Sequence, residues 1–204
     1  MKRFIQITAV AAVLPLLFAC GSSKKVAETP KSPSQEVLDY ALNAPKGVLR
    51  GYGSYNDTEE WFAYKMAAAA ARSEVAATIS TQMESAAKAY KGKYGKESYD
   101  NESIKRGDKD NEKRDEGGFD QIAGEILQGA KVVKAAVVKE SNGTLTVYAC
   151  VEVDSDLIAQ YAANNNKIKD LISEDEKMTI DFHREEFENA LKERFEKYYE
   201  QRGR

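Results

Sequence analysis

Cysteine and histidine are almost absent from this chain of 204 residues, and their scarcity limits the chemistry open to it. The two cysteines are Cys20 and Cys150, and the one histidine is His183. A zinc site usually draws on several Cys and His ligands, and small exported domains are often held by cysteine pairs. Because Cys20 belongs to an N-terminal signal, Cys150 has no partner within the chain. We therefore expect no internal disulfide and no metal site.

A basic block is also lacking. The 30 Lys and Arg residues are offset by 33 Asp and Glu residues, and both signs are spread along the chain. Nucleic-acid binding needs a clustered basic face that releases counterions from phosphates. We expect no nucleic-acid partner.

The first twenty residues have the pattern of a bacterial export signal. Lys2 and Arg3 precede an apolar stretch at 4–17, which is too short to span a membrane, since a spanning helix needs about 20 apolar residues. Residues 17–21 read Leu-Phe-Ala-Cys-Gly, and this pattern resembles the lipobox of bacterial lipoproteins. The resemblance implies that Cys20 becomes the lipidated N-terminus of the mature protein. A secreted soluble protein is the alternative.

A lipobox also implies a location in the cell envelope. Gly21, rather than Asp, after the lipidated cysteine is typical of lipoproteins sorted to the outer membrane of Gram-negative bacteria. Multiple acyl chains hold a protein stably on a membrane, whereas one chain binds marginally. We expect lipid anchoring at the outer membrane, facing the periplasm.

Composition divides the chain into four regions. Residues 1–19 form the signal peptide, and 20–44 predict a lipidated N-terminus and flexible tether, because the stretch is small, polar and proline-rich at its start. A short helix from Ser34 to Leu42 can follow within that region. Residues 45–155 predict an α+β core, interrupted by a polar insertion at 91–118 that reads as a loop. Residues 156–204 predict a charged helical C-terminal region.

Two glycines predict a close contact between a strand and a helix. Gly51 and Gly53 lie on one face of a predicted strand at 47–55, and a glycine pair on one face favours close approach of another backbone. The helix predicted over 61–90 is rich in alanine and is capped by Asp57. Its apolar stripe comprises Ala68, Val75, Ile79, Met83, Ala86 and Tyr90.

A β-hairpin is predicted from residues 132–139 and 144–153, which are rich in Val and alternate in polarity. Asn142 and Gly143 favour a two-residue type I′ turn. That turn would set Val138 opposite Val147 and Ala136 opposite Ala149.

Further helices are predicted around and after the hairpin. One covers 119–128 and ends at Gly129; another starts at Asp154 or Ser155, with Leu157, Ile158 and Tyr161 as its apolar side. Ser173 and Glu176 predict a capping box for a long C-terminal helix. Its apolar stripe comprises Ile180, Phe187, Leu191, Phe195 and Tyr198.

Three motifs accompany this order of elements: Arg-Gly-Tyr-Gly-Ser at 50–54, the alanine run that leads into Arg-Ser-Glu-Val at 67–75, and Val-Val-Lys-x-x-Val at 132–137. Together, the motifs and the order of elements resemble the Lpp-twenty lipoprotein family. The resemblance covers 45–155 and implies a dodecin-like core. The predicted fold class is therefore α+β, with a small antiparallel sheet gripping one long Ala-rich helix and additional C-terminal helices.

The pattern of polar residues is not typical of an enzyme. His183 is predicted to lie within the C-terminal helix, and the acidic stretch 108–116 departs from a calcium loop at Arg114. We expect a non-enzymatic interaction or assembly module without a cofactor. The alternatives are a small-ligand binder using the helix–sheet crevice, and a hydrolase in which a cleft gathers His183 with carboxylates.

Three aromatic residues are the candidates for ligand or partner contact. Tyr52 and Tyr55 lie on opposite faces of the predicted strand, so at least one of them points away from the core. Trp61, with Phe62 and Tyr64, is either a ligand-stacking face or a plug between the helix end and the sheet. The expected partners are the membrane, through the anchor, and envelope proteins or a second copy of the chain.

Overall fold

A computed structural model of the chain describes residues 30–94, 96–97, 117–173, 178–179 and 181–202. The signal peptide, Cys20 and most of the predicted tether lie outside the described residues. Lys31–Arg204 form one compact unit. Within its described part, no helix has the length and apolar character needed to cross a membrane.

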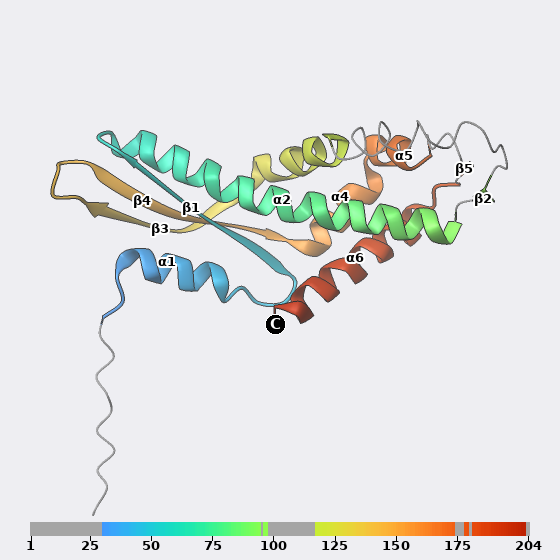
Figure 1. The fold of residues 1–204 in the computed structure, drawn as a ribbon, viewed down its shortest axis with the longest axis horizontal. Coiled ribbons are helices and arrows are strands. Elements are labelled where there is room, and N and C mark those ends of the chain that lie inside the picture. Colours follow the sequence, from blue (N-terminus) through green and yellow to red (C-terminus); the bar gives the residue numbers. More distant parts are fainter. Residues whose placement is uncertain (1–29, 95, 98–116, 174–177, 180, 203–204) are drawn as a thin grey trace, which may run out of the picture. The chain divides into compact units, whose positions relative to one another are not determined.

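The predicted α+β class is confirmed by a three-stranded antiparallel sheet and a long helix (Figure 1). The strands are β1 (Val48–Asp57), β3 (Lys131–Lys139) and β4 (Leu145–Asp154), and their order is β1-β4-β3. Helix α2 (Glu60–Tyr94) lies along one face of the sheet, and α1 (Pro33–Leu42) lies against the other. At 1.5 Å per residue, α2 is about 52 Å long.

The predicted close contact between strand and helix is confirmed at both glycines. A Cβ atom on Gly51 would lie 2.2 Å from the carbonyl oxygen of Ala71, and one on Gly53 would lie 2.3 Å from that of Ala67. No other residue type fits these positions without moving α2. All six residues of the predicted apolar stripe on α2 are buried: Ala68, Val75, Ile79, Met83, Ala86 and Tyr90.

The hairpin is confirmed, but its turn and register differ from the prediction. The Glu140 N–H donates to the Thr144 carbonyl (2.9 Å), and the Gly143 N–H donates back to the Glu140 carbonyl (3.1 Å). Gly143 has a φ of 87°, whereas Asn142 does not have the positive φ that a type I′ turn requires. The loop is therefore a residue longer than predicted. It sets Val137 opposite Val147 and Ala135 opposite Ala149, one residue away from the predicted pairs.

Part of the predicted tether is folded. The side chains of Val37 and Ala41 on α1 are buried against Cys150 of β4. The helix is capped by Ser32, whose hydroxyl accepts from the Gln35 N–H (3.3 Å), rather than by Ser34. Leu42, predicted on the apolar side, is exposed.

Two other predicted caps are wrong. Asp57 is the last residue of β1, and its carboxylate accepts from the Glu59 N–H (3.0 Å) in the turn before α2. The first helical bond instead runs from the Ala63 N–H to the Glu59 carbonyl. After the helix at 117–126, the chain continues as the 3₁₀ helix η1 (Leu127–Gly129), so Ala130 is the cap in place of Gly129.

The described residues of the C-terminal region form three helices. Asp154 caps α4 (Ser155–Asn164), as predicted, and α5 (Asn166–Ser173) follows. The predicted capping box at Ser173 is wrong, because Ser173 ends α5 and α6 (Arg184–Gln201) begins after His183. Between them the chain forms β5 (Met178–Thr179), which pairs with β2 (Lys96–Glu97). Glu176 and Ile180 lie outside the described residues, as do residues 98–116 of the predicted insertion.

One hydrophobic core joins the sheet, α2 and the C-terminal helices. The buried residues of α6 follow the predicted spacing, except that Tyr199 is buried and Tyr198 is only partly so. Helix α2 extends through Tyr94 into the predicted insertion. The C-terminal part of α2 packs against α6, with the Tyr90 ring 5.9 Å from that of Phe187. The buried residues of α6 are Phe187, Leu191, Phe195 and Tyr199.

Candidate functional site

Three aromatic rings meet where β1 ends and α2 begins. The Phe62 ring lies 5.9 Å from the Tyr55 ring and 5.9 Å from the Trp61 ring, in edge-to-face contacts. Trp61 is 60% exposed and Tyr55 is 36% exposed. We call Tyr55, Trp61 and Phe62 the aromatic cluster. Since Trp61 is exposed, it does not plug the helix end against the sheet.

Local hydrogen bonds hold the aromatic cluster in place. The Asn56 amide donates to the hydroxyls of Thr144 (2.9 Å) and Thr146 (2.8 Å), and so fixes the end of β1 to the hairpin. The Trp61 indole N–H donates to the Glu59 carboxylate at 3.0 Å. A surface made of two backbone elements joined by a short turn loses little conformational entropy when a partner binds.

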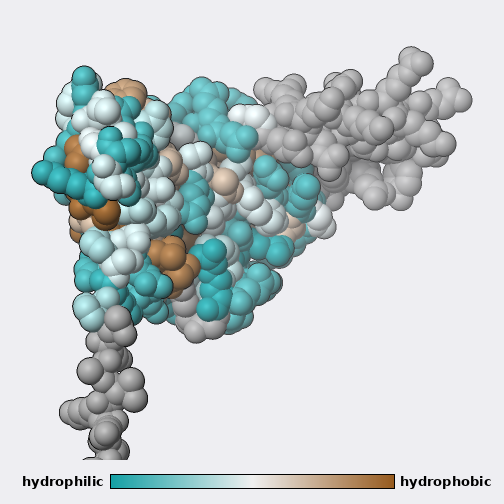
Figure 2. Space-filling view, turned by 60° about the vertical axis from the view of Figure 1, so that its left-hand side comes forward, coloured by the Kyte–Doolittle hydropathy of each residue, from teal (hydrophilic) through white to brown (hydrophobic). Residues whose placement is uncertain are grey.

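The end of the compact unit that carries the start of α2 and the β3–β4 turn is shown in Figure 2. Apolar residues there form small separate patches on a hydrophilic surface, rather than one continuous apolar face. The exposed large apolar side chains on the first turns of α2 also include Tyr64 (40%) and Met66 (36%). Lys65 lies among them, with its ammonium 4.7 Å from the Trp61 ring centroid.

Tyr52, the third predicted contact residue, lies on the opposite face of the sheet. Its ring stacks on that of Tyr148 at 6.2 Å, beside α1. Burial raises the pKa of the Tyr52 hydroxyl. The structure therefore brings Tyr55 and Trp61 together and keeps Tyr52 apart from them.

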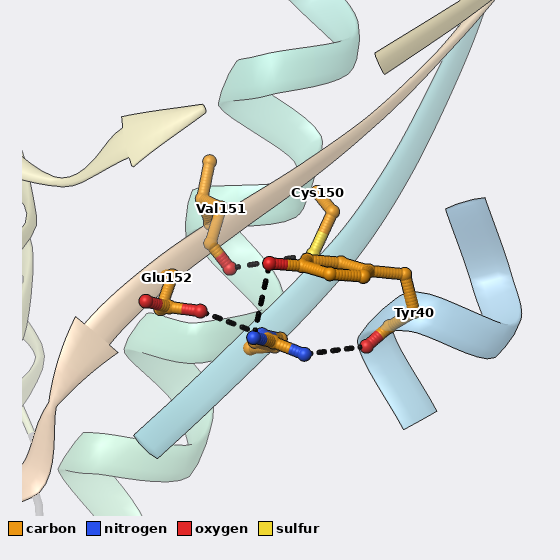
Figure 3. Close-up of polar contacts among 5 residues, drawn as sticks. Tyr40, Cys150, Val151 and Glu152 are labelled. Atoms are coloured by element: carbon orange, nitrogen blue, oxygen red, sulfur yellow. Dashed lines mark hydrogen bonds and ion pairs between the residues drawn. The ribbon is translucent and has the colours of Figure 1, made fainter. Parts of the chain in front are cut away.

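A polar network beneath α1 was not found from the sequence (Figure 3). The Arg50 guanidinium pairs with Glu152 (2.7 Å) and donates to the Tyr40 carbonyl (2.9 Å) and hydroxyl (3.1 Å). It also lies 3.8 Å from the centroid of the Tyr40 ring. Through its contacts with Tyr40, Arg50 holds α1 on the sheet, while its ion pair with Glu152 joins β1 to β4. Arg50 and Glu152 lie opposite each other on β1 and β4. Their ion pair could have been predicted only if the pairing of these two strands had been known.

Cys150 lies under α1 and is fully buried. Burial raises the pKa of its thiol to about 11. A thiol that stays protonated is a poor nucleophile and a poor metal ligand. Cys150 is therefore a small buried side chain of the core between α1 and the sheet.

A groove of about 480 Å³ lies between α4, the helix at 117–126 and the start of β3. Leu157 (62% exposed) and Tyr161 (46% exposed) stand on its rim. Both were predicted on the buried side of α4, but the helix buries the face that contains its alanines. The buried residues of α4 are Ser155, Ile158, Ala159, Ala162 and Ala163.

His183 lies at the start of α6, in an open depression that also holds Glu185 and Glu186. The Glu186 carboxylate accepts from the Tyr94 hydroxyl (2.6 Å). This bond, with the nearby Lys93 ammonium, lowers the pKa of Glu186. Among the described residues that line the depression there is no Ser, Thr or Cys that His183 could activate.

Among the residues that the structure describes, no three His, Cys, Asp or Glu side chains are grouped to hold a metal ion. Comparisons of the chain with protein-family models, with curated proteins and with solved structures gave no match. The resemblance to the Lpp-twenty family, carried by motifs within residues 45–155, stays a prediction.

Proposed function

We propose that this protein is a non-enzymatic lipoprotein of the Lpp-twenty type. In this proposal, lipid on Cys20 anchors it at the outer membrane, and the folded part binds another envelope protein. The observation that carries the proposal is the exposed aromatic cluster, which β1 and α2 hold in a fixed arrangement.

Aromatic side chains suit protein recognition for physical reasons. Tyr and Trp bury a large area with few rotatable bonds, and they are enriched among the residues that dominate binding energies. A partner can bury much of the exposed Trp61 side chain without any unfolding of the domain. The anchor adds to this by confining the domain to the membrane surface, where the effective concentration of an envelope partner is high.

Crosslinking from intact membranes tests both parts of the proposal. We expect the full-length chain to fractionate with the membrane and to crosslink to a discrete partner. Replacing Tyr55 and Trp61 together by alanine should lower the crosslink yield by roughly fivefold or more, because exposed aromatic anchors dominate such contacts. Cys20→Ser should release the protein from the membrane fraction.

Tyr161→Ala is the matched control, because it removes an exposed aromatic side chain from the rim of the groove and leaves the aromatic cluster intact. Its crosslink yield should equal that of the unaltered protein. Loss of the crosslink in Tyr161→Ala, with full yield in the Tyr55 and Trp61 double variant, would overturn the assignment to the aromatic cluster.

A second candidate function is small-ligand binding. The helix–sheet crevice offers no space at Gly51 and Gly53, where even a Cβ atom would clash with α2. The groove beside α4 is the better place, because about 480 Å³ lies within the range of small-molecule sites. Its lining is mainly apolar, with a few carboxylates and Lys131 at its edge.

A further inference from the structure

The two outer edges of the sheet differ in how their backbone hydrogen-bonding groups are covered. Since the strand order is β1-β4-β3, β1 and β3 both have an outer edge. On β1, the outward N–H of Tyr52 donates to the Glu74 carboxylate of α2 (2.6 Å). A side chain of the protein itself thus occupies one of the hydrogen-bonding positions that an added strand would need on β1.

The outer edge of β3 has no such cover within the described residues. The bond from the Glu140 N–H to the Thr144 carbonyl fixes which residues face β4, because these alternate along an antiparallel ladder. The intervening residues turn their N–H and C=O groups outward, and no described group bonds to them. These outward residues are Ala135, Val137 and Lys139.

The side chains on this edge are apolar and incompletely covered. Ala135 and Val137 share a face with their partners Ala149 and Val147, which are fully buried under α2. Val137 itself is 40% exposed, so the cover that α2 provides ends before β3. A strand added beside β3 would extend this apolar face and bury the side chain of Val137.

The charge on the edge strand has one sign. The sequence of β3 is Lys-Val-Val-Lys-Ala-Ala-Val-Val-Lys, with lysines at both ends. Lys134 lies 5.4 Å from the Tyr40 ring centroid, whereas Lys131 and Lys139 form no ion pair with a described residue. Lysines on an edge discourage pairing between copies. Antiparallel pairing of two β3 strands over their full length would set Lys131 opposite Lys139.

We propose that the outer edge of β3 binds an extended segment of a protein partner, which adds a fourth strand to the sheet. The segment that fits carries β-branched or small apolar residues in its middle and Asp or Glu at its ends. Backbone hydrogen bonds supply the contact, and the terminal lysines select the acidic sequence. This surface is separate from the aromatic cluster, so the inference does not rest on the proposed function.

The test uses the full-length protein and two synthetic peptides of alternating Val and Thr. One peptide has Glu at both ends and the other has Lys. In titration calorimetry, the Glu peptide should bind at least roughly tenfold more tightly than the Lys peptide, because like charges across the edge cost affinity. Hydrogen exchange should slow on binding at the amides of Ala135, Val137 and Lys139.

Variants of β3 locate the binding site. Val137→Pro removes one outward N–H without removing a bond between β3 and β4, so it should weaken binding while Val137→Thr retains it. Lys139→Glu should weaken the Glu peptide and strengthen the Lys peptide, and it decides the question if the proline variant does not fold. Lys169→Glu, on the exposed face of α5, is the control for net charge and should change neither affinity.

Equal binding of the two peptides, or exchange that does not slow at these three amides, would overturn the proposal. Protein that self-associates without peptide and protects the same amides would also overturn it, by showing that a second copy occupies the edge. None of these results would affect the crosslinking experiment on the aromatic cluster, which tests the proposed function independently.

Discussion

At position 150, burial rather than redox environment determines the chemistry of the thiol. We expect Cys150 to resist alkylation near pH 8 in the folded protein, since its side chain is covered by α1 and its pKa is raised to about 11. The rate of labelling with iodoacetamide, followed by mass spectrometry, should be limited by the local unfolding that exposes the thiol. Addition of urea should make labelling fast. Rapid labelling of the native protein would contradict the buried position.

The same thiol makes the stability of the protein depend on pH in alkaline solution. Its pKa is about 9 when unfolded and about 11 when folded, so between these values the unfolded state loses its proton first. The free energy of unfolding should therefore fall as pH rises through this window, by roughly 2–3 kcal/mol from this group. Cys150→Ala should show a shallower decline in urea unfolding between pH 9 and 11. An identical decline in both proteins would exclude the thiol as its source.

Among the elements, the contact between β1 and α2 depends most on residue size. Gly51→Ala should destabilise the protein by roughly 1–3 kcal/mol, because its Cβ would lie 2.2 Å from the Ala71 carbonyl oxygen. Gly124→Ala is the matched control, since Gly124 lies in a helix and no atom beyond its neighbouring residues and the adjacent helix backbone lies within 4 Å of an added Cβ. It should stabilise by roughly 0.5–1 kcal/mol. Urea midpoints measure both, and equal midpoints would refute the close contact.

The sequence predicts the close contact between β1 and α2 because both elements carry small residues there. The strand has glycines on one face, and the helix is rich in alanine. The sequence does not predict the hairpin register, since Asn142-Gly143 suits both a two-residue loop and a longer loop in which only the glycine has positive φ. It also misplaces α4. Hydrophobicity ranks Leu157 above Ala159, but close helix packing buries the alanine and leaves the leucine exposed.

The aromatic cluster was partly predictable from the sequence. Tyr55 and Trp61 are only a short turn apart in the chain, so their proximity follows from the predicted strand and helix. The exposure of Trp61 did not follow from the sequence, which left open whether this residue plugs the helix end against the sheet. The free edge of β3 depends on the strand order, which the hairpin alone leaves open.

For the whole molecule, the shared core means that the sheet and the C-terminal helices should unfold together. Phe187→Ala on α6 should cost about 3–5 kcal/mol, because this fully buried ring contacts Tyr90 of α2 and Phe182. Circular dichroism in the far and near ultraviolet should give coincident transitions. Leu157→Ala, at an exposed leucine, should change stability by less than about 0.5 kcal/mol. Two separated transitions would show that α6 folds apart from the sheet.

The position of Trp61 has an optical consequence. It is the one tryptophan in the chain, and most of its indole already faces water in the folded state. Its fluorescence emission should therefore lie near the wavelength of a free indole in water and change little when the protein unfolds. A partner that covers the aromatic cluster would move the indole into less polar surroundings and shift the emission to shorter wavelengths. The protein thus carries an intrinsic fluorophore that reports binding rather than folding.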